Sequence, residues 1–392
     1  MDTRTHAART PALTSRLPAV GTTIFSVMSA LAAEHDAVNL GQGFPDFHCD
    51  PRLVDAVTAA MQAGHNQYPP MAGIAPLREA VAIKIEALHA RQYCPSTEIT
   101  ITAGATQAIF TAILAVVHEG DEVIVLEPCY DSYVPNIALA GGTAVRVPLT
   151  PGSFRPDFIK IAAAITPRTR AIVVNSPHNP SATVWSAEEM RQLEALLAPT
   201  DIVLISDEVY EHMVFDGQAH QSAARFPGLA ARAFIVSSFG KTFHVTGWKV
   251  GSVAAPAALM AEFRKVHQFN VFTVNTPMQH ALARYLQDPA PWQNLAGFYQ
   301  AKRDLFRSGL SETRLRLLPG SGSGSYFQCV DIAEVTDLNE ADFCQWLTRE
   351  VGVAAIPLSA FYGSGFDQRV VRFCFAKKDQ TLLDALERLR KL

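Results

Sequence analysis

The chain has 392 residues, of which 48% are apolar and 18% are charged. This composition is typical of a globular protein with a large core, and it excludes disordered, collagen-like and coiled-coil proteins. Its length predicts two or more domains at roughly 100–200 residues per domain, and its net charge of −4 does not favour a nucleic-acid partner.

The cysteine pattern and the N-terminus bear on the compartment. Six cysteines are spread along the chain: Cys49, Cys94, Cys129, Cys329, Cys344 and Cys374. No two lie within four residues, which excludes a C-x-x-C zinc or redox motif. We therefore expect buried, reduced thiols in a cytoplasmic protein. Residues 1–16 lack the apolar segment of a secretory signal and are expected to form a mobile arm, and no apolar run reaches the roughly 18 residues of a membrane span.

From residue 99 onward, short apolar runs typical of strands alternate with segments typical of helices. The expected strands are residues 99–102, 122–126, 171–174, 202–205 and 234–237. The expected helices between them are 107–117, 132–140 and 187–197, and Ser186 introduces the last one. This alternation predicts an α/β domain with a mostly parallel sheet that helices cover on both faces.

The C-terminal part has a different order of elements, typical of a smaller α+β domain. Helices are expected at 301–310, 340–350 and 381–392, and strands at 326–330 and 370–375. Pro289 and Pro291 break regular structure and mark the junction with the preceding domain. The GSGSGS run at 320–325 does not match G-x-G-x-x-G and precedes no helix, so we expect a flexible loop there.

Ligands of open parallel sheets bind beyond the carboxyl ends of the strands, so the residues after each strand are candidate site residues. In chain order these residues are Gly104, Ala105 and Thr106, then Asn179, then Asp207 and Tyr210, and finally Ser238 and Lys241. Each type also has a purely structural interpretation: small residues form turns, Asp caps helices, and Asn before Pro is typical of a turn. A lysine at the end of an apolar strand is unusual, and a desolvated lysine amine is a nucleophile, although an exposed loop lysine remains an alternative.

Together these residues fit one cofactor, pyridoxal 5′-phosphate (PLP). PLP needs a lysine for its aldehyde and a carboxylate that faces its pyridine nitrogen, and Lys241 and Asp207 supply these groups. It also needs donors for its phenolic oxygen, here Asn179 and Tyr210, and for its phosphate, here Ser238 with the backbone of residues 105–106.

Six stretches, in this order, resemble the fold-type I, class I PLP-dependent aminotransferases. They are GQGFPD (41–46), NQYPPMAGIAPLR (66–78), NSPHNP (175–180), SDEVY (206–210), SSFGKTFHVTGWKVG (237–251) and VRF (371–373). Each match is weak alone, but the ordered set is highly specific. GQGFPD together with TGWKVG is most similar to the subgroup of methionine aminotransferases and kynurenine–glutamine transaminases.

The resemblance implies an architecture and a set of cofactor contacts. It implies a large PLP-binding domain (45–288) with a mostly parallel seven-stranded sheet, and a small α+β domain formed by residues 1–44 and 289–392. Lys241 would hold PLP and move the proton from the amino acid, while Asp207 would keep the pyridine nitrogen protonated. Asn179 and Tyr210 would bind the phenolic oxygen, and Tyr130 would stack on the ring.

The resemblance also implies contacts to the phosphate and a homodimer. The phosphate ligands would be Gly104, Ala105, Thr106, Ser238 and Lys249, with Tyr68 reaching in from the other subunit. Many class I members have arginine where this chain has Lys249, which offers a point charge instead of a bidentate fork. The subgroup named above also has lysine there, so the resemblance holds.

For the substrate, the resemblance implies that Arg372 binds the α-carboxylate as a bidentate pair, with the Gly43 backbone and Asn179 nearby. Aromatic residues could line the pocket: Phe25, Phe44, Tyr68, Tyr130, Phe361 and Tyr362. We therefore expect a preference for methionine, aromatic or kynurenine-like amino acids, unless these rings only pack the domain interface.

The expected reaction moves the amino group of an L-amino acid to a 2-oxo acid in a ping-pong scheme, without a metal. A PLP-dependent cysteine-conjugate or C–S β-lyase is the alternative, and it would release pyruvate and ammonia with no oxo acid present. A regulatory module with an attached DNA-binding domain is disfavoured, because the 40 residues before Gly41 do not resemble a helix-turn-helix.

Overall fold

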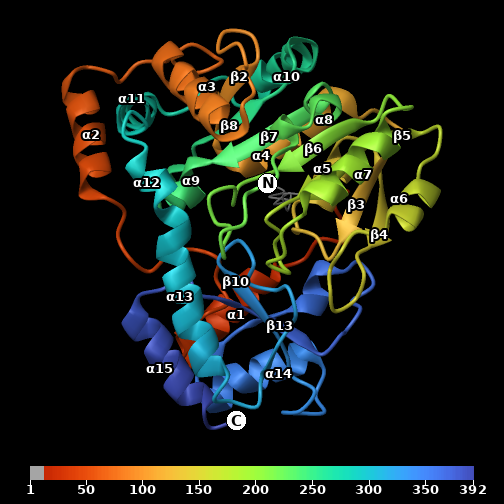
Figure 1. Cartoon of the computed structure of the whole chain (residues 1–392), viewed down its shortest axis with the longest axis vertical. Helices are drawn as coiled ribbons and strands as arrows, with labels where there is room; N and C mark the ends of the chain where they lie inside the picture. The colour runs from red at the N-terminus through yellow and green to blue at the C-terminus, as the bar shows by residue number, and fades with distance from the viewer. Residues whose placement is uncertain (1–12) are drawn as a thin grey trace, which may run out of the picture.

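The structure is a computed structural model of the chain and describes residues 13–392. Of the expected N-terminal arm, residues 1–12 lie outside the described residues. Figure 1 shows a large sheet with its helices in the upper part and a smaller group of helices and strands in the lower part. Nowhere in residues 13–392 is a helix long and apolar enough to cross a membrane.

The upper part is built on one seven-stranded sheet with the order β2-β8-β7-β6-β5-β3-β4. Its strands are β2 (Ile99–Thr102), β3 (Glu122–Glu127), β4 (Thr143–Pro148), β5 (Thr169–Asn175), β6 (Val203–Asp207), β7 (Ala233–Ser238) and β8 (Gly251–Ala254). Strands β3 to β7 are parallel to one another, and β8 runs antiparallel to both of its neighbours. The expected mostly parallel, seven-stranded sheet is confirmed.

Helices bury both faces of this sheet. On one face lie α4 (Gly104–Val116), α5 (Tyr133–Leu139) and α10 (Ala257–Asn270), and on the other α3 (Ala75–His89), α6 (Phe158–Ala163), α7 (Ala187–Leu197) and α8 (Pro227–Ala230). Alternate strand residues point to opposite faces, so that Val123 and Val125 of β3 join one apolar cluster and Ile124 and Leu126 the other. Burial on both faces explains why these strands are continuous apolar runs in the sequence.

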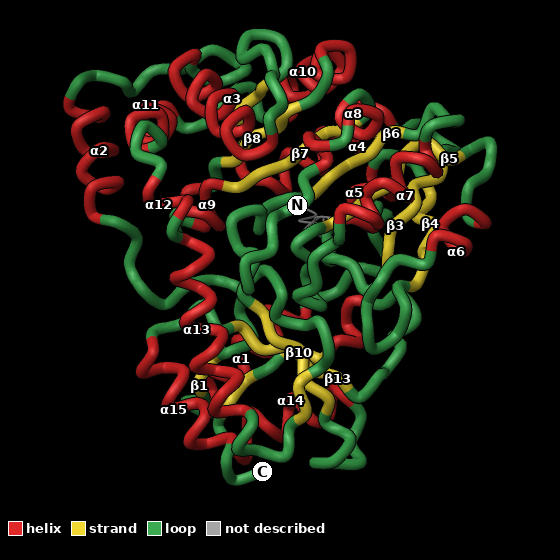
Figure 2. Tube along the Cα trace, in the orientation of Figure 1, coloured by secondary structure: helices red, strands yellow, loops and turns green. Residues whose placement is uncertain are grey.

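The lower part contains a four-stranded antiparallel sheet with the order β12-β13-β10-β9 (Figure 2). The strands are β9 (Arg316–Leu317), β10 (Phe327–Asp331), β12 (Ile356–Pro357) and β13 (Val370–Cys374). The helices are α13 (Leu295–Leu310), α14 (Glu340–Trp346), which continues into a π-helical turn (Leu347–Val351), and α15 (Asp379–Leu389). Helices α13 and α15 pack against each other, since the four leucines Leu382, Leu386, Leu389 and Leu310 are buried in one cluster.

The N-terminal segment belongs with the lower part. Helix α1 (Ile24–Glu34) leads into β1 (Val38–Asn39), which pairs in parallel with β11 (Val353–Ala354). Helices α2 (Pro51–Gln62) and α11 (Thr276–Tyr285) pack against each other on one side of the upper part, and α12 (Ala290–Gln293) leads from there into α13.

Two expectations are corrected by the structure. The 320–325 loop is not free: Ser321 and Ser325 are buried, and the Gly324 N–H donates a hydrogen bond to the Ala182 carbonyl. Backbone hydrogen bonds to the upper part therefore hold a segment whose composition suggests mobility. All six cysteines are free, as expected, but Cys94 is exposed and Cys49 is half-buried, so only the other four are buried thiols.

Candidate active site

Three neighbouring strands of the large sheet end at one pocket. Asn175 at the end of β5 pairs in register with Asp207 at the end of β6, and β7 lies beside β6. After β7 the chain turns into the short helix α9 (Phe239–Thr242), which carries Lys241. The polar side chains that follow these strands therefore meet at one edge of the sheet, as parallel strands require.

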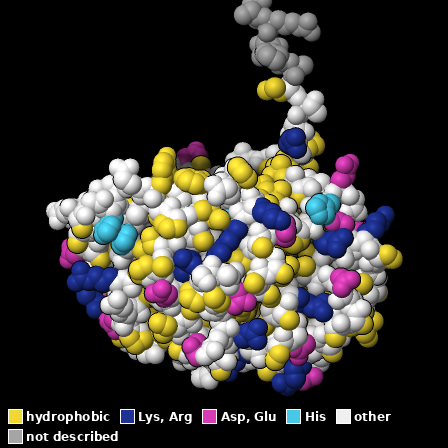
Figure 3. Space-filling model, turned by 90° about the horizontal axis from the view of Figure 1, so that it is seen from above, with side chains coloured by type: hydrophobic (Ala, Val, Ile, Leu, Met, Phe, Trp, Pro, Cys, Tyr) yellow, Lys and Arg dark blue, Asp and Glu magenta, His cyan; other side chains and the backbone are white. Residues whose placement is uncertain are grey.

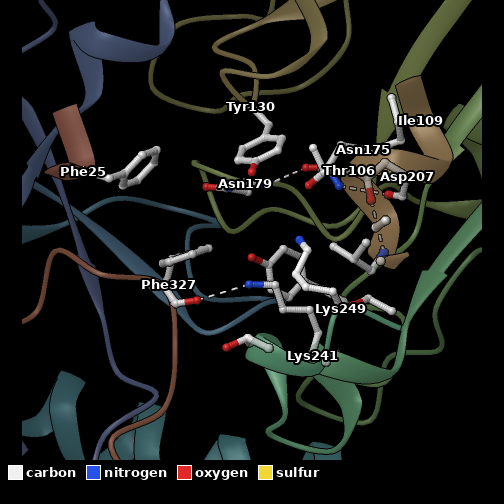
Figure 4. Close-up of a pocket in the computed structure, with 18 of the residues that line it drawn as sticks. Phe25, Thr106, Ile109, Tyr130, Asn175, Asn179, Asp207, Lys241, Lys249 and Phe327 are labelled. Atoms are coloured by element: carbon white, nitrogen blue, oxygen red, sulfur yellow. Dashed lines mark hydrogen bonds between the residues drawn. The ribbon is translucent and has the colours of Figure 1, made fainter. Parts of the chain in front are cut away.

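The pocket has a volume of about 300 Å³ and is lined by residues of both parts of the molecule (Figure 4). The sequence-predicted residues that line it are Phe25, Gly43, Gly104, Ala105, Thr106, Tyr130, Asn179, Asp207, Tyr210, Ser238, Lys241, Lys249 and Arg372. Figure 4 shows Tyr130 and Lys241 on opposite sides of the cavity, and Phe25 far from Asp207 across it. Segments that are hundreds of residues apart in the chain thus surround one space.

The amine of Lys241 lies in this pocket, and its pKa is lower than that of a free lysine. Its Nζ donates hydrogen bonds to the Gly43 carbonyl at 3.1 Å and to the Tyr326 hydroxyl at 2.7 Å. Burial of the amine lowers the pKa of Lys241 to about 8, since removal from water penalises the ammonium form. A substantial neutral fraction at physiological pH makes Nζ available as a nucleophile or base.

Asp207 is a buried carboxylate that two donors orient. The Tyr133 hydroxyl donates to Oδ2 at 2.5 Å, and the Val209 N–H donates to Oδ1 at 3.3 Å. Burial raises the pKa of Asp207 to about 6, and these two hydrogen bonds oppose the increase because they stabilise the ionised form. The carboxylate can therefore hold a cationic ring nitrogen at neutral pH.

One region of the pocket is suited to an anion. Gly104 opens α4 with φ of +79°, and a Cβ at this position would lie 3.4 Å from the Lys249 Nζ. The lysine ammonium is therefore beside the helix N-terminus, where backbone N–H groups and the helix dipole favour negative charge. Thr106 and Ser238, whose hydroxyls can donate to an anion, are also among the lining residues.

Arg372 is the buried cation on the side of the pocket that the lower sheet supplies. Its Nη1 donates to the Asn179 Oδ1 at 2.6 Å and its Nη2 to the Gly41 carbonyl at 2.9 Å, while its Nε has no partner within residues 13–392. The guanidinium stacks on Phe327 with 3.9 Å between Cζ and the ring centroid. The guanidinium is thereby fixed in one orientation at the wall of the pocket.

Four of the aromatic residues considered from the sequence do not line the pocket. Phe44 is 46% exposed, and Phe361 and Tyr362 are buried behind the wall, where Phe361 packs edge-on against Phe25 at 5.9 Å. Tyr68 is 81% exposed and packs against Phe272 on the surface of the chain. Phe361 and Tyr362 therefore pack behind the pocket wall and do not line the space for a ligand.

Sequence reasoning missed three residues that the structure brings to the site. Tyr133 orients Asp207, the Asn175 side chain donates to the Asp207 carbonyl at 2.9 Å, and Tyr326 contacts Lys241. Tyr133 is the first residue of α5, and an aromatic residue at that position is typical of core packing, so its type gave no signal. Tyr326 begins an expected strand of the C-terminal part, and no sequence pattern indicates that this strand faces Lys241.

The donor set of the pocket fits PLP. A lysine with a neutral fraction suits an aldehyde, and the buried Asp207 suits a pyridine nitrogen. The positive end formed by Lys249 and the start of α4 suits a phosphate. Glycine suits position 104 because its φ of +79° is one that side chains rarely adopt.

Comparison with known proteins places the chain in a family. The model of the aminotransferase class I and II family matches residues 35–389. The chain therefore belongs to the class I and II aminotransferases, whose members depend on PLP. It is accordingly a PLP-dependent aminotransferase, as the six sequence stretches predicted.

Similar curated proteins come from bacteria and animals. A methionine aminotransferase from Escherichia coli strain K12 is 51% identical over 379 residues, which cover 96% of this chain and 98% of that protein. Kynurenine–oxoglutarate transaminase 1 from Homo sapiens is 38% identical over 397 residues, with 92% and 93% covered. The resemblance to this subgroup is confirmed.

Solved structures agree with these matches. The structure of an E. coli protein with a methionine aminotransferase function has a TM-score of 0.96 and 50% identity, and it covers 98% of this chain and 100% of that one. Aspartate aminotransferase from Thermus thermophilus has a TM-score of 0.88 and 31% identity, with 97% and 100% covered. The fold thus hosts related enzymes whose substrates differ, and substrate choice must be argued from the pocket.

Proposed function

We propose that this aminotransferase prefers methionine and other apolar or aromatic L-amino acids as donors. The observation that carries the proposal is the character of the pocket wall beside Arg372. Phe25 and Phe327 flank the guanidinium there, and Arg372 itself binds the α-carboxylate. The other cationic side chains among the described lining residues, Lys241 and Lys249, belong to the cofactor, so none remains for an acidic substrate side chain.

We infer the following roles for the residues that contact the cofactor and the substrate. PLP, when bound, acts as an electron sink for the negative charge that remains on Cα after its proton is removed. Lys241 holds the cofactor aldehyde, and its neutral Nζ later accepts the Cα proton. Asp207 faces the ring nitrogen, and Asn179 and Tyr210 bind the phenolic oxygen.

The remaining contacts orient the two ligands. Tyr130 covers the cofactor ring from the side opposite Lys241, which matches its place in Figure 4. Residues 104–106, Ser238 and Lys249 bind the phosphate. Arg372, already fixed by Asn179 and Gly41, binds the substrate carboxylate without a further loss of side-chain freedom.

A panel of amino donors tests the substrate proposal. The holoenzyme is mixed with one amino acid at a time, with no oxo acid present, and the absorbance change of the bound cofactor is followed. We expect kcat/KM for methionine and phenylalanine to exceed that for aspartate at least about tenfold, since a buried unpaired carboxylate is strongly disfavoured. Faster turnover of aspartate than of methionine would overturn the proposal.

We also propose that the enzyme is a cytoplasmic homodimer whose two copies complete each other's sites. The support is a set of exposed aromatic side chains: Tyr68 and Phe272, which pack against each other, are 81% and 40% exposed, and Phe269 near the end of α10 is 90% exposed. The loop after α10 is fixed beside Tyr68, because the Thr276 hydroxyl donates to the Gln67 carbonyl at 2.6 Å. Large exposed rings of this kind are typical of an interface, and Tyr68 would contact the phosphate in the other copy.

Light scattering of two variants tests the dimer. Phe269→Asp is expected to convert the protein to monomers and to weaken PLP binding, because a charge would be buried at the interface. Ile159→Asp is the matched control, since Ile159 is 84% exposed on α6. A wild-type protein that is monomeric at micromolar concentration would contradict the proposal.

The face shown in Figure 3 has interspersed positive and negative side chains, and this mixture does not favour binding of a polyanion such as a nucleic acid.

A further inference from the structure

Three separate segments meet at the Lys241 amine. Gly43 comes from the chain that follows β1, Tyr326 precedes β10 of the lower sheet, and Lys241 lies on α9 beside the upper sheet. The Lys241 Nζ is 2.7 Å from the Tyr326 oxygen and 3.1 Å from the Gly43 carbonyl oxygen. The Tyr326 hydroxyl also hydrogen-bonds the Gly43 carbonyl. The three groups therefore form a closed triangle.

The direction of each hydrogen bond in this triangle follows from the number of hydrogens. In its ammonium form Lys241 only donates and a carbonyl only accepts, so the single hydroxyl hydrogen of Tyr326 goes to Gly43. The Tyr326 oxygen can then only accept, and Lys241 must donate to it. A neutral amine has two N–H groups and one lone pair, and Tyr326 and Gly43 take both N–H groups. An amine that keeps both hydrogen bonds has its lone pair at the remaining position of Nζ.

The Tyr326 ring is itself fixed by its neighbours. Its centroid lies 4.9 Å from that of Phe327, 5.1 Å from that of Tyr210 and 5.8 Å from that of Tyr299. The side chain is fully buried, with 1% of its surface exposed. The hydroxyl therefore has one position available, and that position is beside Lys241.

We propose that Tyr326 is a positioning residue for Lys241, which holds the free ε-amine so that its lone pair faces the substrate. The proposal rests on the proposed role of Lys241 as the lysine that binds PLP and takes the Cα proton. The structure shows Tyr326 in contact with the free amine. Its contribution therefore falls on the steps in which Lys241 acts as a base.

The matched pair Tyr326→Phe and Tyr299→Phe isolates this contribution. Each variant removes one buried phenolic oxygen from the same aromatic cluster, but the Tyr299 hydroxyl has no hydrogen-bond partner among the described residues. For Tyr326→Phe we expect kcat to fall about tenfold with KM for the amino acid unchanged, which corresponds to the loss of one hydrogen bond to a charged or reacting group. For Tyr299→Phe we expect both constants to stay at the wild-type value.

The reactivity of the apoenzyme gives a second readout that needs no turnover. Acylation of Lys241 is followed against pH by peptide mass spectrometry, and in the wild type its midpoint is expected at about 8. An oxygen that accepts from the ammonium stabilises the charged form, so Tyr326→Phe should lower this midpoint by about one unit. Tyr299→Phe should leave the midpoint where it is. An unchanged kcat and midpoint in Tyr326→Phe would overturn the proposal.

Two measurements on the wild-type protein complete the test. Borohydride reduction of the holoenzyme followed by peptide mapping identifies the lysine that carries the cofactor. If the reduced cofactor is found on Lys241 but Tyr326→Phe has no effect, only the positioning role of Tyr326 is refuted. If the reduced cofactor is found on another lysine, the assignment of Lys241 to the cofactor is refuted as well. A crystal structure of the apoenzyme should place Nζ about 3 Å from the Tyr326 oxygen, and a Tyr326 side chain that points away from Lys241 would overturn the proposal without any variant.

Discussion

At the scale of single residues, the pocket shifts both Lys241 and Asp207 toward their neutral forms. Burial lowers the pKa of Lys241 to about 8 and raises that of Asp207 to about 6, although each charge partly stabilises the other. At pH 7 about one Lys241 amine in ten is then neutral, compared with fewer than about one in a thousand for a free lysine. Because the pKa of Asp207 is close to neutral pH, the hydrogen-bond donors around it determine what fraction of this carboxylate is ionised.

Tyr133 is the donor whose removal tests this balance. Its hydroxyl stabilises the ionised carboxylate, so Tyr133→Phe should raise the pKa of Asp207 further, by about one unit. The fraction of ionised Asp207 is lost as the pH falls through this pKa, and the acid limb of PLP affinity should accordingly move to higher pH. The measurement is the dissociation constant of PLP between pH 5 and 8.

Tyr93→Phe is the control for this prediction, because Tyr93 is buried and its hydroxyl has no partner within residues 13–392. The control should keep the wild-type pH profile. Identical profiles for all three proteins would show that Tyr133 does not set the ionisation of Asp207.

Residue types at the strand ends and the resemblance to the family predicted residues that line the pocket, but not the residues that orient them. Lys241 and Asp207 stand out because each is a charged residue at the end of an apolar strand, whereas only the resemblance to the family indicated Arg372. Tyr133 and Tyr326 carry no such signal, since an aromatic residue in an apolar segment is normally part of the core. Their roles follow from tertiary contacts with residues 74 and 85 positions away.

At the scale of elements, strands formed by buried, mostly apolar runs were predictable, and strands with exposed positions or small residues were not. Strands β2, β5 and β7 are apolar runs, whereas β4 is an edge strand with exposed positions and Arg146, and β8 consists of the small residues GSVA. Helix α13 begins at Leu295, six residues before the expected start, because packing overrides the low helix propensity of Gly297.

A buried ion pair attaches α3 to the turn that carries Tyr210. The Lys84 Nζ lies 2.6 Å from the Glu211 Oε1, and both side chains are less than a tenth exposed. Lys84→Met leaves Glu211 buried without its countercharge, and we expect a loss of about 3–5 kcal/mol in the free energy of unfolding. The double variant Lys84→Met/Glu211→Gln should recover part of this loss. Urea denaturation measures the free energy of unfolding of the wild type, the single variant and the double variant.

The exposed pair of Arg191 and Glu188 on α7 provides the contrast, since both side chains are about 60% exposed. Arg191→Ala should change the unfolding free energy by less than about 1 kcal/mol. Equal effects of Lys84→Met and Arg191→Ala would mean that the buried pair does not hold α3 in place.

At the scale of the whole molecule, the pocket lies between the two parts of the chain. We propose that residues 45–288 form the large domain and that residues 13–44 and 289–392 together form the small one, because β1 pairs with β11. Lys241 and Asp207 come from the large part, while Arg372, Gly43 and Tyr326 come from the small part. A bound amino acid that contacts both sets links the two parts.

This arrangement predicts that a substrate-like ligand stabilises the whole molecule through Arg372. The compound 4-(methylthio)butanoate has the carboxylate and thioether of methionine but no amine, so it binds without reacting. At a hundredfold excess over its Kd it should raise the free energy of unfolding by about 2.7 kcal/mol. In Arg372→Gln the ligand should hardly raise the free energy of unfolding, because an amide cannot replace a bidentate guanidinium that is buried beside Phe327. Arg316→Gln is the control, because Arg316 is exposed and pairs with Glu334. This variant should be stabilised by the ligand as much as the wild type, as measured by thermal unfolding with and without the ligand. Equal stabilisation of all three proteins would show that the carboxylate is bound elsewhere and that the ligand does not link the two parts at Arg372.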